Sequence, residues 1–97
     1  MRGYNGFKSQ LTIVAIPYNV DKENEMVFYN IITYILIRHD VIHHTAVPNR
    51  DGMAFVQMES YSKTEHNRVL RCAKELVKYQ KGAVLIAEEN YDYKYGF

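Results

Sequence analysis

The stretch VIHHTAVPNRDGMAFVQME, residues 41–59, decides the fold of this chain. Residues 41–47 and 53–59 are rich in apolar and β-branched side chains, which favour strands. The five residues between them, PNRDG at 48–52, have the composition of a turn. Because two strands joined by a short loop pair with each other, this stretch predicts an antiparallel β-hairpin.

Helical patterns flank the hairpin on both sides. Residues 26–38 repeat apolar side chains at helical spacing, after a polar, acidic segment at 19–24 that suits a helix start. The apolar arc of this first helix is wider than one buried face requires, which leaves two outcomes open. Either Tyr29, Tyr34 or Ile37 stays exposed and meets a partner, or the sheet and the loops cover the whole helix.

The second helical pattern follows the hairpin directly. Residues 62–65 (SKTE) have the spacing of a capping box, and apolar residues then recur at helical spacing as far as residue 80. Lys81-Gly82 ends this helix.

Two further apolar runs complete the pattern, LTIVAIPY at residues 11–18 and AVLIA at residues 83–87. The order of elements is then βαββαβ. Two βαβ units with right-handed crossovers predict an α+β, ferredoxin-like sandwich, in which a four-stranded antiparallel sheet carries both helices on one face. The other face of the sheet would be open.

The chain of 97 residues predicts one domain at 10–90, a flexible N-terminal arm at 1–9 and a tyrosine-rich extension at 91–97. Its single cysteine, Cys72, cannot form an internal disulfide, which fits a reducing compartment. No apolar run reaches the roughly 20 residues of a membrane span. We therefore expect a soluble intracellular protein, cytoplasmic or nuclear, that does not enter a membrane.

Charge is distributed unevenly along the chain. The net charge is only +1, yet residues 21–59 carry three Lys/Arg against six Asp/Glu, and residues 60–81 carry six against two. This second segment predicts either a local basic face or an ordinary solvated helix surface.

The third predicted strand resembles the longer signature of the RNA recognition motif, K/R-G-F/Y-G/A-F-V-x-F/Y. Residues 51–58 read DGMAFVQM, so four positions match: Gly52, Ala54, Phe55 and Val56. The shorter signature on the first strand is largely lost, because Thr12 stands at its aromatic position and Ala15 at its asparagine. The chain thus resembles a degenerate member of this family over roughly residues 10–90.

This resemblance implies that single-stranded RNA binds on the open sheet face. Alternate strand residues point to opposite faces, so if Ala54 and Val56 pack on the helices, Phe55 faces outward, where an unpaired base can stack on it. The candidate RNA-binding residues are Phe55, Met53, Gln57, Arg50, Thr12, His43 and His44. Because His43 and His44 are adjacent, only one of them can share the face of Phe55 on a regular strand.

The C-terminal segment offers a second kind of partner. Four aromatic residues alternate with other residues there and share one side of an extended chain: Tyr91, Tyr93, Tyr95 and Phe97. They predict a continuation of the last strand that covers the open sheet face, a contact with a protein partner, stacking of bases, or a disordered segment. The alternative function is therefore a protein-interaction or inhibitor domain, as a homodimer or as an accessory protein of the kind that viruses and phages encode.

No catalytic, metal or cofactor site is predicted. His39, His43 and His44 are close in sequence but leave a helix and enter a strand, and Cys72 is distant, so they form no ligand set for a metal ion. YNVD at residues 18–21 only weakly resembles small metal-dependent nucleases that carry Tyr-Asp after their first strand. We expect a non-enzymatic binding module without a cofactor.

Overall fold

The computed structural model describes residues 9–17, 22–48, 52–79 and 81–90. The predicted order of elements is confirmed, with bounds as follows: β1 (Gln10–Pro17), α1 (Lys22–Arg38), β2 (His44–Pro48), β3 (Met53–Ser60), α2 (Lys63–Tyr79) and β4 (Val84–Asn90). The predictions for Arg50, for most of the N-terminal arm and for the extension at 91–97 fall outside the described residues.

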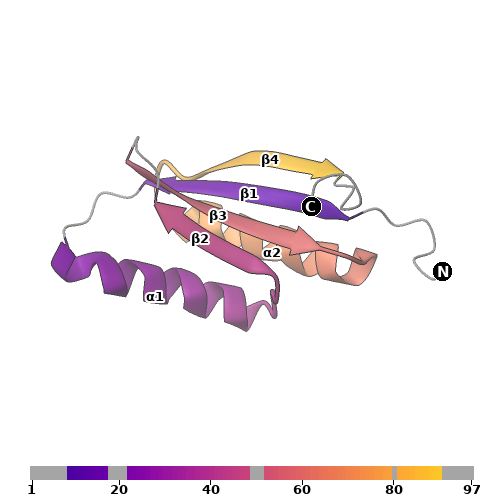
Figure 1. The fold of residues 1–97 in the computed structure, drawn as a ribbon, viewed down its shortest axis with the longest axis horizontal. Helices are drawn as coiled ribbons and strands as arrows, with labels where there is room; N and C mark the ends of the chain where they lie inside the picture. Colours follow the sequence, from indigo (N-terminus) through magenta and orange to yellow (C-terminus); the bar gives the residue numbers. More distant parts are fainter. Residues whose placement is uncertain (1–8, 18–21, 49–51, 80, 91–97) are drawn as a thin grey trace.

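The four strands form one antiparallel sheet in the order β2-β3-β1-β4. Figure 1 shows α2 behind the sheet and α1 along the edge of the molecule beside β2. Apolar side chains from both helices join one buried cluster with the same face of the sheet, for example Ile32 of α1, Leu76 of α2 and Val56 of β3. The arrangement is α+β and compatible with the predicted ferredoxin-like sandwich.

The predicted alternation along β3 is confirmed. Ala54, Val56 and Met58 are completely buried against the helices. The intervening side chains, Met53 and Phe55 among them, are half-buried on the opposite face. This period of two means that β3 supplies both the core and the face of the sheet that the described helices leave uncovered, called the open face below.

The position predicted for Thr12 is wrong. Thr12 pairs with Met58 across β1 and β3, and both side chains are completely buried on the helix side of the sheet. Leu11 and Ile13, not Thr12, share the face of Phe55. Because neighbouring residues of a strand point to opposite faces, the burial of Thr12 removes it from the face of Phe55.

Burial of Thr12 has a consequence for stability. Its hydroxyl Oγ1 is buried and has no hydrogen-bond partner among the described residues. A buried hydroxyl that lacks a partner costs about 1–3 kcal/mol. We expect Thr12→Val, which keeps the branched shape, to raise the free energy of unfolding by about 1 kcal/mol in urea denaturation. Thr12→Ala is the control, and it should not stabilise because it leaves a cavity; a destabilised Thr12→Val variant would contradict the prediction.

The end of α1 explains why β2 begins later than predicted. Asp40 adopts a left-handed conformation with φ of 62°, and its N–H donates to Ile37 O at 2.9 Å. The N–H of Val41 then donates to Leu36 O at 3.0 Å, and the Val41 side chain is buried. These bonds cap the free carbonyls of the helix. The chain changes direction between α1 and β2 over the residues up to His43. The strand therefore starts at His44 instead of at Val41.

The predicted capping box is present at the start of α2. Ser62 Oγ accepts a hydrogen bond from the Glu65 N–H at 3.1 Å, and the Glu65 carboxylate accepts one from the Tyr61 N–H at 2.7 Å. The first bond satisfies a donor that the helix start leaves free, whereas the second reaches the residue before the N-cap Ser62 and not the N-cap N–H of a standard capping box. In the turn after α2, Gly82 has a φ of 94°, and a Cβ atom at this position would lie 3.1 Å from the Pro17 side chain. Both observations favour glycine in this turn.

Candidate functional site on the open sheet face

Phe55 lies in the central part of the open face. On this face its neighbours in register are Ala15 of β1 and Val47 of β2. Ala15 is almost completely buried, whereas Phe55 is half-buried and Val47 is exposed. A large aromatic side chain beside a small one leaves part of the ring accessible for stacking.

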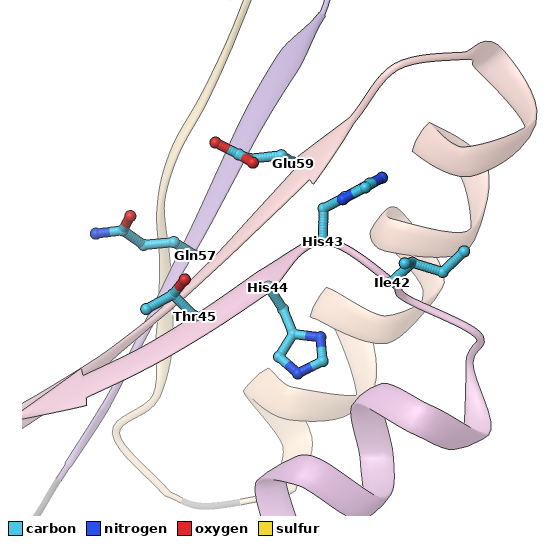
Figure 2. A pocket seen from close by; sticks show the side chains of 6 residues that line it. All are labelled: Ile42, His43, His44, Thr45, Gln57 and Glu59. Carbon is cyan, nitrogen blue, oxygen red and sulfur yellow. The ribbon is translucent and has the colours of Figure 1, made fainter. Parts of the chain in front are cut away.

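A polar hollow of about 300 Å³ adjoins this position, between β2 and β3. Figure 2 shows its lining residues, which are Ile42, His43, His44, Thr45, Gln57 and Glu59. Thr45 and Gln57 are direct partners in the sheet register and point to the same side. Gln57 follows Phe55 by two residues on β3, so the hollow and the aromatic side chain share one face.

A short chain of contacts positions the rim of the hollow. The rings of His43 and Tyr61 meet edge to face with centroids 4.8 Å apart. The Tyr61 hydroxyl donates to the Glu59 carboxylate at 3.2 Å. The backbone N–H of Glu59 donates to His43 O at 2.9 Å, which continues the pairing of the hairpin beyond β2. The hollow thus combines carboxylate, amide, hydroxyl and imidazole groups.

His44 lies on the other side of β2 from His43. Figure 2 shows the His44 ring pointing away from the side chains of Thr45 and Gln57. Its register partner is the buried Met58, and its Nδ1 lies 3.0 Å from the carbonyl oxygen of Val41, to which an Nδ1–H would donate. The His44 ring therefore faces away from the open side of the sheet, contrary to its inclusion among the open-face residues, although both His43 and His44 line the hollow.

The third histidine of the sequence cluster is engaged elsewhere. His39 Nε2 lies 2.7 Å from the Glu75 carboxylate, which also pairs with Arg38. Burial, followed by the charges of Arg38 and Arg71, lowers the pKa of His39 below its usual 6.5. A neutral imidazole can still donate from Nε2 to a carboxylate. These contacts join the end of α1 to α2.

Metal binding and thiol chemistry have no visible support in the described part of the chain. Within it, no group of three His, Cys, Asp or Glu side chains is placed to hold a metal ion. Cys72 is completely buried, and burial raises the pKa of its thiol to about 12. A buried thiol of this kind is a core side chain and a poor nucleophile.

The basic residues of the second half do not lie on the open face. Arg71, Lys74 and Lys78 are exposed on α2, which covers the opposite face of the sheet. Lys74 and Lys78 border a mainly apolar hollow of about 280 Å³, whose other lining residues are Leu70, Ala73, Val77 and Leu85. The stacking position at Phe55 and these three basic side chains therefore lie on different sides of the sheet.

No family model and no curated protein matches this chain. Neither described helix is both long enough and apolar enough to cross a membrane. Four of the predicted residues lie on or beside the same face of the sheet, namely Phe55, Met53, Gln57 and His43. Three residues that were not predicted lie next to them: Thr45, Glu59 and Tyr61. The sequence placed Thr45 on the hairpin, but its pairing with Gln57 depends on the strand register that the structure shows.

Proposed function

We propose that this chain is a ferredoxin-like, RNA-recognition-motif-like domain that binds single-stranded RNA on its open sheet face and catalyses no reaction. One observation carries the proposal: Phe55 is partly accessible beside a polar hollow of about 300 Å³. An aromatic side chain stacks an unpaired base, and adjacent polar groups bind the edge of a base. The partial match of residues 51–58 to the family signature supports the same function.

The hollow supplies several groups for a base edge. The Glu59 carboxylate accepts hydrogen bonds, the Gln57 amide both donates and accepts, and the Thr45 hydroxyl does both. Amino and imino groups on the Watson–Crick edge of a base are matched donors for a carboxylate. Stacking on Phe55 and edge recognition at Gln57 would therefore act on neighbouring parts of one RNA segment.

Salt dependence tests this proposal. Each phosphate contact in a single-stranded complex contributes about −0.7 to the slope of log affinity against log salt. Because Arg71, Lys74 and Lys78 lie on the helix side, we expect a shallow slope of about −1 to −2. The measurement is a fluorescence-anisotropy titration of a random-sequence RNA of about eight nucleotides, a common site size, at low and moderate salt.

The same titration has two contrary outcomes. A slope several times steeper would assign RNA to the basic side of α2 instead of to the open face. An absence of binding at low salt would reject RNA as the ligand. Random-sequence single-stranded DNA of the same length serves as the matched ligand, because it lacks the 2′-hydroxyl by which proteins distinguish RNA.

A further inference from the structure

The two helices differ sharply in what they expose. Both contain 17 residues. α2 buries Val69, Cys72 and Leu76 and exposes charged residues, the usual pattern of a surface helix. On α1, by contrast, five large apolar side chains are between 37% and 71% exposed, namely Met26, Val27, Ile31, Tyr34 and Ile37. A helix that is apolar on both sides is normally buried on both sides.

Part of this exposed surface forms a stripe with charged ends. At 3.6 residues per turn, Glu23, Val27, Ile31, Tyr34 and Arg38 fall within an arc of about 80° along the helix. Val27, Ile31 and Tyr34 form the apolar middle of this α1 stripe, with an acid in the first helical turn and a base in the last. The Arg38 guanidinium lies 5.6 Å from the centre of the Tyr34 ring, as expected for two residues on the same side of α1.

The α1 stripe is complementary to itself when it is reversed. A twofold axis that passes between Asn30 and Ile31 places Val27 opposite Tyr34 of the second copy, and Glu23 opposite its Arg38. Two copies packed antiparallel would therefore bring apolar residues onto apolar residues. At each end Glu23 would lie opposite Arg38, which also pairs with Glu75 of its own chain. An isologous interface requires this kind of self-complementarity. Met26 and Ile37 lie beside the stripe and would be covered at its margin.

We propose that α1 is a homodimerisation helix that packs antiparallel against α1 of a second copy of this chain. The proposal is independent of RNA binding, because α1 lies on the opposite side of the sheet from Phe55. A pair of helices buries less than the about 1,200–2,000 Å² of a standard stable interface. The dimer is therefore weak, and it forms reversibly at micromolar concentrations.

Sedimentation equilibrium measures this association directly. Between about 5 and about 500 µM, which brackets micromolar affinity, the wild-type chain should change from monomer to dimer. Tyr34→Lys should raise the dissociation constant at least about tenfold, because tyrosine is a frequent hot-spot residue and the substitution occurs twice in each dimer. Glu23→Arg should raise it about two- to fivefold, as expected for an exposed charge pair. Asn67→Lys on α2 is the control and should change nothing.

Disulfide trapping tests the antiparallel orientation. Two copies of Ile31→Cys, next to the axis, should oxidise to a covalent dimer. Val27→Cys should cross-link poorly to itself but well in a mixture with Tyr34→Cys. The buried Cys72, with a pKa of about 12, should stay reduced, and Asn67→Cys reports random collisions. A monomer at every concentration, a dimer insensitive to Tyr34→Lys, or efficient Val27→Cys self-linkage would each overturn the proposal, whereas RNA titration of the same samples would be unaffected.

Discussion

Phe55→Ala should lower the affinity for single-stranded RNA by about 5- to 150-fold, the equivalent of about 1–3 kcal/mol for one stacked base. The reason is geometric. Phe55 presents an accessible aromatic side chain on the open face, and its neighbours there in register, Ala15 and Val47, offer no ring that could replace it. The measurement is anisotropy titration of the wild type and the variant at low salt.

Phe55→Tyr is the matched control for this experiment. It keeps the ring and adds only a hydroxyl, so affinity should stay within a fewfold of the wild type. Urea denaturation of both variants separates binding from folding, since Phe55 is half-buried and its truncation also removes cross-strand contacts. Unchanged RNA affinity in a folded Phe55→Ala variant would remove the sheet face from the proposed function.

Leu76→Ala should lower the free energy of unfolding by about 2–5 kcal/mol. Leu76 is completely buried, and its helix, α2, packs against β1, β3, β4 and α1. The cavity would therefore open at the place where the helix layer meets the sheet. Because small domains have only about 5–15 kcal/mol of stability, this single change could remove a large part of it. Urea denaturation followed by circular dichroism measures the loss.

Leu85→Ala removes the same atoms at an exposed position. Leu85 of β4 is 47% exposed, against 0% for Leu76, so its truncation should cost less than about 1 kcal/mol. Equal losses in the two variants would contradict the burial pattern of α2. The pair also tests whether α2 is the central element of the core.

Much of the fold was predictable because local patterns agree with one another. Residues 41–59 indicated the hairpin, the SKTE capping box at 62–65 marked the start of α2, and Gly82 marked its end. The period of two along β3 predicted that Phe55 points away from the helices, because its neighbour Val56 was assigned to the core. These predictions depend on backbone periodicity and on turn and cap chemistry, which act over a few residues.

Other features depended on contacts between distant segments. Thr12 faces the helices because β1 pairs with β3 in one particular register, and a single-residue shift would have turned it outward. The capped end of α1 delays the start of β2, so His43 lies before the strand and His44 is its first residue. Likewise, the basic residues of α2 are opposite the open face because the helix packs on the other side of the sheet.

The amino-acid sequence by itself determined the order of elements, the hairpin and the partly aromatic face of β3, since periods of 2.0 and 3.6 residues are properties of a single segment. Only the tertiary structure decided which of the apolar residues of α1 are buried. Its pattern is apolar on two sides, and packing against α2 and the sheet covers Phe28 and Ile32 while Val27 and Tyr34 stay exposed. The position of neighbouring elements determines burial when a segment offers more apolar surface than one face can use.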